Sequence, residues 1–245
     1  MPATTAQITI DTADGPMPAF EATPGDDAPG GIVVIQEAFG VTPHIEDITR
    51  RLADAGWYAV APALFHRQGS PVLGYDDFSQ VMPVMGQLDA RGLDLDVAAA
   101  FDHLERIGFA PDRMGIVGFC MGGSVTFRAA TTRSIGAAVT FYGGGVAEGR
   151  FGLPSLIDQA PELRTPWLGL YGDQDTGIPV DQVEALRRAT AAVAVETEIV
   201  RYPDAEHGFN CDARPSFNPA AAADAWRRTL AWLEEHLVGD ESDGG

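Results

Sequence analysis

The chain has 245 residues and a formal net charge of −19 at pH 7, from 35 acidic and 16 basic side chains. This length is enough for one large hydrophobic core, so we expect residues 1–245 to form a single domain. The negative charge argues against nucleic acids and anionic membranes as partners, because both require a basic patch that replaces their counterions. All basic residues are arginine, which excludes Schiff-base chemistry through a lysine.

The number of cysteines and the N-terminal sequence indicate the cellular compartment. Two cysteines, Cys120 and Cys211, are too few for a disulfide framework, and a free thiol nucleophile suits a reducing compartment. The N-terminus lacks a basic segment followed by an apolar core, and no apolar run approaches the about 20 residues of a membrane span. We therefore expect a cytoplasmic protein, a monomer or small homo-oligomer, whose partners are small molecules. The sequence shows no metal-ligand cluster of His and Cys, and we expect neither a metal nor a cofactor.

Hydrophobic patterning predicts alternating strands and helices. Two short segments around Ile8–Ile10 and Phe20, separated by Asp14-Gly15-Pro16, predict an N-terminal hairpin at a sheet edge. Residues 31–36 are apolar without alternation and predict a strand covered on both faces, and 114–118 predicts a short buried strand. Further strands are predicted at 58–61, 135–142, 167–171 and 195–202. Helical spacing predicts helices at 43–55, 95–107, 125–130, 180–192 and 220–237. This order is typical of an α/β fold with a mostly parallel sheet covered by helices on both faces.

Two segments stand outside this alternation. Residues 63–88 mix Gly, Pro, Ser and aromatics with little periodicity, and we expect them to lie over the site as a loop or lid. Residues 239–245 are polar and predict a frayed tail.

The stretch Gly118-Phe119-Cys120-Met121-Gly122-Gly123 follows a predicted buried strand and contains a candidate catalytic nucleophile. It has the form of the Gly-x-Ser-x-Gly strand-to-helix nucleophile elbow, with cysteine in place of serine. Its glycines give the tight turn room, and the N-terminus of the following helix favours a thiolate. The alternative is a buried cysteine that packs between strand and helix, since free Cys is among the most buried residue types. The flanking glycines and the downstream partners favour Cys120 as a nucleophile.

Candidate partners follow in chain order. Asp173 and Asp175 come directly after the strand 167–171, and His207 lies in the loop after the next strand. The order nucleophile, acid, histidine is that of the α/β-hydrolases, in which the imidazole holds the nucleophile's proton and a carboxylate fixes its tautomer. We prefer Asp175 as the acid. Asp173 and Asp204 remain alternatives, because either could lie at a strand end or only form an Asx-turn. The other histidines are expected to be structural or solvated: His44, His66, His103 and His236.

Four stretches together resemble the dienelactone hydrolase (carboxymethylenebutenolidase) family: Gln36-Glu37-Ala38-Phe39-Gly40, the Cys120 elbow, Gly172-x-x-Asp175 and His207-Gly208-Phe209. The resemblance covers nearly the whole chain and implies the α/β-hydrolase fold. In that family a Cys-His-Asp triad opens an enol lactone, and a glutamate after an early strand takes part in activating the thiol. The resemblance implies these roles for Cys120, His207, Asp175 and Glu37.

Residues around this constellation complete the predicted site. A carboxylate that leaves a wholly apolar strand is costly unless it is paired, so Glu37 is unusual; the alternative is a helix-entry or salt-bridge glutamate. Backbone N–H groups of Ala38 and Met121 match the donor pair expected of an oxyanion hole. The expected substrate-binding residues are aromatic: Phe39, Tyr75, Phe78, Tyr142 and Phe209.

The sequence departs from the family in one respect. The dienelactone-cleaving member binds its substrate's carboxylate with arginines, one shortly after the catalytic histidine and one in the segment matching 75–89. Here Cys211 stands four residues after His207, and 75–89 contains no arginine. Arg67, Arg91 or Arg214 could take this place in space. We therefore expect no strict requirement for a carboxylate on the substrate.

The function expected from these residues is hydrolysis of a small ester or lactone through a cysteinyl acyl-enzyme. Two alternatives use the same fold: a general carboxylesterase or thioesterase, and a non-catalytic protein that binds a ligand in the hydrolase pocket.

Overall fold

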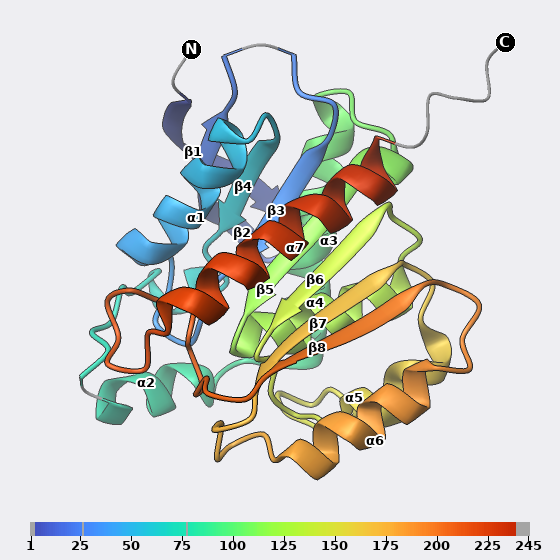
Figure 1. The fold of residues 1–245 in the computed structure, drawn as a ribbon. Helices are drawn as coiled ribbons and strands as arrows, with labels where there is room; N and C mark the ends of the chain where they lie inside the picture. Colours follow the sequence, from blue (N-terminus) through green and yellow to red (C-terminus); the bar gives the residue numbers. More distant parts are fainter. Residues whose placement is uncertain (1–2, 26, 77, 239–245) are drawn as a thin grey trace, which may run out of the picture.

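The computed structural model describes residues 3–25, 27–76 and 78–238, and its centre is one eight-stranded sheet with the strand order β1-β2-β4-β3-β5-β6-β7-β8 (Figure 1). The strands β1 and β2 form an antiparallel hairpin at one edge, and β2 also pairs with β4 in antiparallel fashion. All remaining neighbours are parallel. The strands are β1 (Thr4–Thr12), β2 (Gly15–Thr23), β3 (Gly31–Ile35), β4 (Tyr58–Pro62), β5 (Met114–Phe119), β6 (Ala137–Phe141), β7 (Trp167–Gly172) and β8 (Thr197–Tyr202).

Helices cover both faces of this sheet. In Figure 1, α1 and α7 lie in front of the strands, and α3 and α4 lie behind them. The helices are α1 (Pro43–Asp54), α2 (Phe78–Met85), α3 (Ala90–Arg106), α4 (Met121–Thr132), α5 (Leu156–Gln159), α6 (Val180–Thr190) and α7 (Pro219–Leu237), with 3-10 turns η1 (His66–Gln68), η2 (Pro111–Arg113) and η3 (Ala160–Glu162). Every residue of β3, β4, β5, β6 and β7 is buried, as expected of strands with helices on both sides. The predicted fold class and the edge hairpin are confirmed.

Local signals explain most helix boundaries. Asn218 caps α7 by accepting a hydrogen bond from the Ala221 N–H at 3.1 Å, and Pro219 occupies the first turn. The helix α3 begins at Ala90, five residues before the predicted start, because Asp89 caps it through the Gly92 N–H at 2.8 Å. No helix among the described residues is long and apolar enough to cross a membrane.

The segment 63–88 differs from the expected loop because it contains η1 and α2. The helix α2 is short and has Pro83 in its interior, so its sequence lacks the usual helical pattern. Val81 anchors it as a fully buried side chain, and the Phe78 ring packs edge-on against Phe39 at a centroid distance of 5.5 Å. The predicted frayed tail, 239–245, lies outside the described residues.

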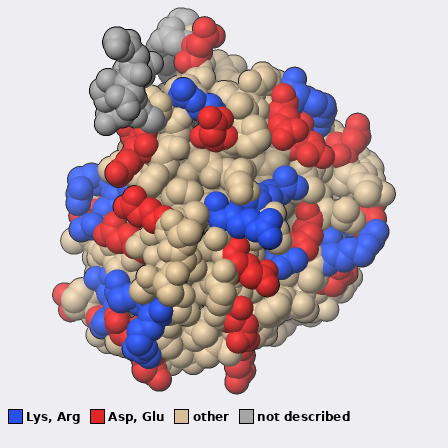
Figure 2. Space-filling model, turned by 90° about the vertical axis from the view of Figure 1, so that its right-hand side faces the viewer, with Lys and Arg blue, Asp and Glu red and all other residues tan. Residues whose placement is uncertain are grey.

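Charged side chains are interspersed on the surface. On the face shown in Figure 2, arginines lie among carboxylates and do not form a continuous basic patch. Many of the arginines are paired: Arg201 binds both Asp173 and Glu184, and Arg228 binds Asp224 and Glu198.

Candidate active site

Cys120 lies between β5 and α4, at the carboxyl end of the central strand. Its backbone has φ 55° and ψ −114°, a conformation that is strained for any residue with a side chain. The turn closes only because its neighbours are glycines: a Cβ on Gly118 would lie 2.2 Å from the Gly122 oxygen. A Cβ on Gly122 would lie 2.5 Å from the Gln36 oxygen. The elbow therefore holds a partly buried Cys120 side chain at the N-terminus of a helix.

His207 forms a hydrogen bond with Asp175, one of the three candidate carboxylates. Its Nδ1 lies 2.6 Å from the Asp175 Oδ2, and a carboxylate can only accept, so Nδ1 carries the proton. Asp175 is buried after β7, and its Oδ1 accepts the Gly177 N–H at 2.8 Å. The rival Asp173 is engaged elsewhere, because the Arg201 guanidinium binds both of its oxygens at 2.7 and 2.8 Å. Asp204 is exposed.

The charge on His207 depends on its two neighbours. Burial by itself lowers the pKa of His207, but a Cys120 thiolate and the hydrogen bond to Asp175 outweigh burial and raise this pKa to about 10. At neutral pH the imidazole is therefore protonated whenever the sulfur is a thiolate. Such an ion pair has a nucleophile and a proton donor ready at the same time.

Glu37 is fully buried directly after β3. Its Oε1 accepts a hydrogen bond from the Arg214 Nη1 at 3.4 Å, and its Oε2 has no hydrogen-bond partner among the described residues. The side chain of Gln36 braces this segment, since its Nε2 donates to the Glu37 backbone oxygen and its Oε1 accepts the Leu64 N–H. A buried, half-satisfied carboxylate is costly, which marks Glu37 as a residue with more than a packing role.

Arg214 reaches the site across Gly208. Gly208 has φ 79°, and a Cβ there would lie 2.2 Å from the Arg214 Nη1, so glycine leaves the room that the guanidinium occupies. The guanidinium also lies over the rings of Phe39 and Tyr75, at 5.7 and 5.9 Å from their centroids.

A cavity of about 370 Å³ brings these groups together. Cys120, Asp175 and His207 line it, as do Ala38 and the predicted substrate contacts Phe39 and Phe78. The remaining wall residues are Met82, Met85, Gly144, Arg150, Thr176, Gly177, Ile178 and Arg214. The segment 63–88, expected over the site, thus contributes α2 to its wall.

The other predicted contacts have different places. Tyr75 lines an adjoining hollow of about 600 Å³, together with His207 and Arg214. Tyr142 and Phe209 are fully buried, and the Tyr142 ring packs against His207 at a centroid distance of 5.1 Å, so both lie beneath the cavity. Met121 is buried as the first residue of α4, where its backbone N–H belongs to the free N-terminal donors of the helix.

Two arginines lie at the cavity wall, and the expectation that a substrate carboxylate is not strictly required stays a prediction. Arg150 and Arg214 line the cavity, although neither stands at the position matched in sequence. Arg67 and Arg91 lie elsewhere, because both pair with Asp14. Arg150 follows the glycine run 143–145 in a segment without periodicity, so no sequence signal pointed to it. Of the three arginines considered from the sequence, Arg214 thus lies at the cavity, and Arg150 joins it there.

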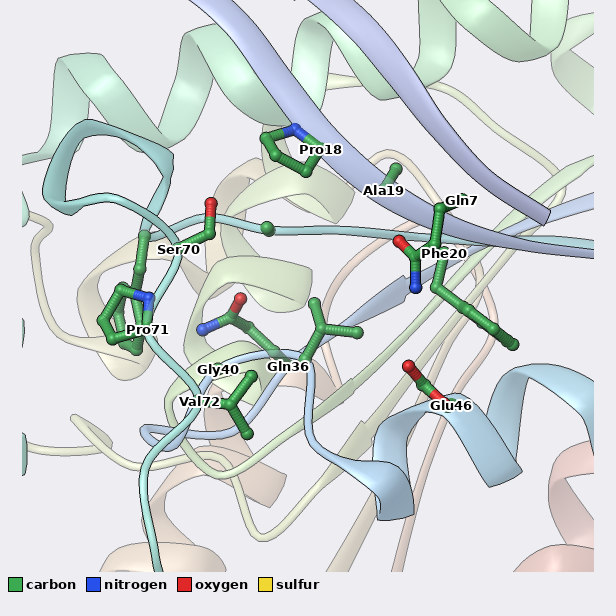
Figure 3. A pocket seen from close by; sticks show the side chains of 13 residues that line it. Gln7, Pro18, Ala19, Phe20, Gln36, Gly40, Glu46, Ser70, Pro71 and Val72 are labelled. Atoms are coloured by element: carbon green, nitrogen blue, oxygen red, sulfur yellow. The ribbon is translucent and has the colours of Figure 1, made fainter.

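A second hollow, of about 170 Å³, lies between β2, the start of α1 and the loop 63–72 (Figure 3). Gln36, Phe20 and Pro71 contribute to its wall, and Glu46, its one carboxylate among the described lining residues, pairs with Arg50 at 2.7 Å. None of the described lining residues carries a thiol or an imidazole. This hollow therefore offers no candidate thiol or imidazole for catalysis, in contrast to the cavity lined by Cys120 and His207.

Comparisons with known proteins identify the family. The chain matches the model of the "Dienelactone hydrolase family" over residues 17–237. A "Putative carboxymethylenebutenolidase" of Salmonella typhimurium is 42% identical over 228 residues, which cover 90% of this chain and 83% of that protein. The protein of the same name from Escherichia coli K12 is 41% identical with the same coverage.

Among solved structures, the "Putative Dienelactone Hydrolase from Klebsiella pneumoniae subsp. pneumoniae MGH 78578" superposes with a TM-score of 0.87 at 39% identity. The match covers 95% of this chain and 99% of that one. The resemblance noted from the sequence motifs is thereby confirmed. This chain belongs to the dienelactone hydrolase family, and it is a hydrolase with the α/β-hydrolase fold.

Proposed function

We propose that this hydrolase cleaves a small ester or lactone through a cysteinyl acyl-enzyme, with Cys120 as nucleophile, His207 as proton carrier and Asp175 as its orienting carboxylate. One observation carries the proposal. A cysteine on a strained elbow lines the same cavity as a histidine whose Nδ1 lies 2.6 Å from a buried carboxylate. This arrangement supplies a nucleophile, a base and an orienting group in the order that acyl transfer requires.

In the first half-reaction the Cys120 thiolate attacks the carbonyl carbon, and a carbon–sulfur bond forms. The resulting oxyanion accepts hydrogen bonds from the Ala38 and Met121 backbone N–H groups, which stand on the cavity wall and at the start of α4. The bond to the leaving oxygen then breaks, and the His207 imidazolium donates its proton to that oxygen. The products are an alcohol, or the opened end of a lactone, and a thioester on Cys120.

In the second half-reaction the neutral His207 takes a proton from water, and the hydroxide attacks the thioester carbon. The carbon–sulfur bond breaks, the sulfur leaves as a thiolate, and the imidazolium is restored beside it. Asp175 keeps the same ring nitrogen protonated throughout, so the other nitrogen faces the reacting atoms in both steps.

Glu37 supplies a further proton acceptor for a resting thiol. Its carboxylate is buried in the segment that also provides Ala38, and its contact with Arg214 links it to the cavity wall. The alternative is that Glu37 has only a structural role. A substitution at Glu37 should reduce turnover if the residue accepts the thiol proton, and stability if its role is structural.

The cavity favours a substrate with an apolar body and an anionic group. The Phe39, Phe78 and Met82 side chains form an apolar, adaptable wall, and Arg150 and Arg214 offer guanidinium groups suited to a carboxylate. A volume of about 370 Å³ lies at the small end of ligand pockets, which suits one ring with a short side chain.

The test is a panel of carboxylated lactones, neutral lactones, linear esters and thioesters, assayed with burst kinetics on an activated ester. We expect a burst of alcohol equivalent to the enzyme concentration and the highest kcat/KM on lactones. A preference for linear esters or thioesters would make the protein a general carboxylesterase or thioesterase. Turnover that persists in Cys120→Ala would refute the mechanism, and tight binding without a burst would identify a ligand-binding protein.

A further inference from the structure

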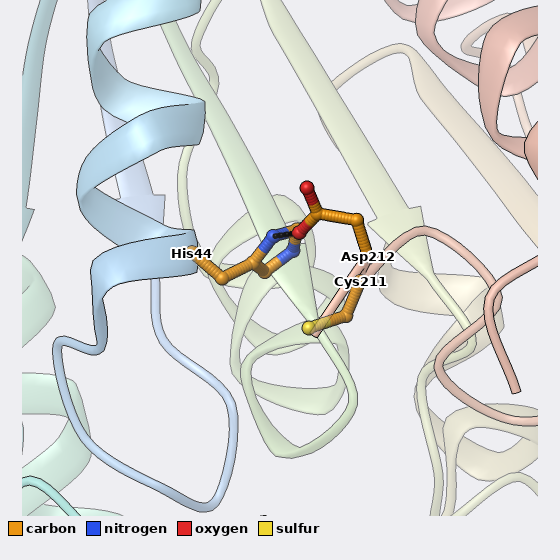
Figure 4. A group of neighbouring side chains, drawn as sticks. All are labelled: His44, Cys211 and Asp212. Atoms are coloured by element: carbon orange, nitrogen blue, oxygen red, sulfur yellow. Dashed lines mark ion pairs between the residues drawn. The ribbon is translucent and has the colours of Figure 1, made fainter. Parts of the chain in front are cut away.

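A cluster of potential metal ligands lies outside the cavity, between the start of α1 and the loop that leads from His207 to α7. His44, Cys211 and Asp212 each offer one ligand atom, and these atoms lie within 4.8 Å of one another. Figure 4 shows the His44 ring extending from its helix toward the two loop residues. The His44 Nδ1 and the Asp212 Oδ1 are 3.9 Å apart. The cluster joins residues far apart in sequence, so linear spacing could not reveal it.

Buried polar atoms at the cluster lack partners. The side chain of His44 is 4% exposed, and its Nε2 has no hydrogen-bond partner among the described residues. The neighbouring Asn210 is also buried, with both its Oδ1 and its Nδ2 unpartnered within the described part of the chain. His44, Asn210 and Asp212 line one cavity of about 220 Å³, which is large enough for an ion and water. Native structures rarely leave several such groups unsatisfied in one place, so these atoms point to a ligand.

We propose that His44, Cys211 and Asp212 bind a divalent transition metal of the zinc class. Imidazole nitrogen, thiolate sulfur and carboxylate oxygen are the three ligand types that Zn²⁺ uses in proteins, and Mg²⁺ or Ca²⁺ would disfavour the sulfur. The Asn210 Oδ1 or a water molecule completes a tetrahedron. Zinc bonds of about 2.0 to 2.3 Å require the ligand atoms to approach by about 1 Å. The Asp212 side chain is 78% exposed and can rotate to do so.

The charges around the cluster favour a cation. Asp47 and Arg51 line the same cavity, and the Arg51 guanidinium lies over the Trp226 ring at 4.0 Å from its centroid. Metal binding releases the thiol proton of Cys211 to solvent. Two carboxylates and one thiolate then face the Arg51 guanidinium, while Glu37 and Arg214, which also act on Cys211, pair with one another. The divalent ion is therefore offset by net negative charge.

The metal would hold the loop that carries His207 and Arg214. The Cys211 N–H donates to the Gly208 oxygen at 3.0 Å, and the Arg214 N–H donates to the Cys211 oxygen at 3.1 Å. A metal anchored to His44 would fix this turn against α1. This role of the metal in the loop does not depend on which ester the enzyme cleaves.

Cobalt(II) is the probe for the test, because a thiolate ligand gives Co²⁺ a sulfur-to-metal charge-transfer band in the near ultraviolet. Untagged, chelator-treated, reduced Cys120→Ala protein is titrated with Co²⁺, so that Cys120 cannot supply the sulfur. We expect the band to appear, to disappear when Zn²⁺ is added, and to be lost in Cys120→Ala/Cys211→Ser. His44→Gln and Asp212→Asn should weaken Zn²⁺ binding by about tenfold to a hundredfold or more. His236→Gln, a change at a histidine beside Glu196, should leave it unaltered.

Thermal unfolding provides a second readout. With Zn²⁺ at about a hundred times its Kd, the melting temperature should rise by about 5 to 10 °C, and the rise should vanish in Cys211→Ser. If Cys211→Ser does not fold, the His44→Gln and Asp212→Asn affinities carry the test. A charge-transfer band that survives in folded Cys120→Ala/Cys211→Ser, or no band at millimolar Co²⁺ in Cys120→Ala, would overturn the proposal.

Discussion

Removing either member of the Glu37–Arg214 pair should have unequal consequences for stability. Arg214→Gln leaves a fully buried carboxylate whose Oε1 loses its cation and whose Oε2 already lacks a partner among the described residues. Breaking a buried ion pair from one side typically costs about 3 to 5 kcal/mol. The 3.4 Å contact is longer than an ideal charge-assisted bond of about 2.7 to 2.9 Å, so we take about 3 kcal/mol. For a chain of this size the melting temperature should fall by about 6 to 12 °C.

The reverse change, Glu37→Gln, removes the buried charge and keeps the shape of the side chain. Arg214 then remains over the Phe39 and Tyr75 rings and beside the open cavity, where water can solvate it. We expect a loss below about 1 kcal/mol and a fall in melting temperature below about 4 °C. Turnover should nevertheless drop, because the proposed acceptor of the thiol proton is gone.

Calorimetry and steady-state kinetics on one ester, at one pH, measure both effects. The double variant Glu37→Gln/Arg214→Gln is the control, since it removes the orphaned charge and should be more stable than Arg214→Gln. The reasoning fails if Glu37→Gln destabilises as much as Arg214→Gln while turnover is unchanged, or if the double variant shows no recovery. The first result would make Glu37 a structural residue, and the second would show that the orphaned carboxylate is not the cause of the loss in Arg214→Gln.

Three further predictions address the triad and the cavity. Losses of kcat in His207→Ala and Asp175→Asn should be non-additive in the double variant, and Asp173→Asn should stay near wild type; an inactive Asp173→Asn with an active Asp175→Asn would reverse the assignment. NMR titration of the His207 ring should give a pKa near 10 that falls in Cys120→Ala, where the charge and hydrogen bond of Cys120 are lost; an unchanged pKa would rule out the ion pair. Because the folded pKa is raised, the pair stabilises the fold fully below pH 6.5, and this contribution is lost as the pH rises toward 10. Arg150→Met should lower kcat/KM for a carboxylated lactone by at least tenfold relative to its methyl ester, and equal losses on both would exclude carboxylate recognition.

Much of the fold could be predicted because the strands are covered on both faces. Continuous apolar runs such as 31–36 and 167–171 leave little choice of structure once helices alternate with them. The helix α2 could not be predicted in this way, since its stability comes from Val81 and from the Phe39–Phe78 contact, which exist only after the chain has folded. The start of α3 was missed for a simpler reason, because the capping signal of Asp89 precedes the periodic residues.

Sequence patterns predict those parts of the candidate site that depend on residues adjacent in the chain. The Cys120 elbow depends on glycines within a few residues, and the close contacts at Gly118 and Gly122 explain why that pattern is informative. The choice of Asp175 over Asp173 as the partner of His207 depends on a contact between residues distant in sequence, because Arg201 on the neighbouring strand binds the Asp173 carboxylate. Arg214 was considered only as one of three arginines, because its reach across Gly208 is a contact through space.

In the proposed mechanism, Cys120 carries the acyl group. The most direct measurement is mass spectrometry of the intact protein and its peptides after rapid acid quenching of a reaction with an activated ester. We predict one added acyl group on the peptide that contains Cys120, present before steady state and absent in Cys120→Ala. An acyl group found on Cys211 or on a serine, or full turnover without any covalent adduct at Cys120, would contradict the mechanism.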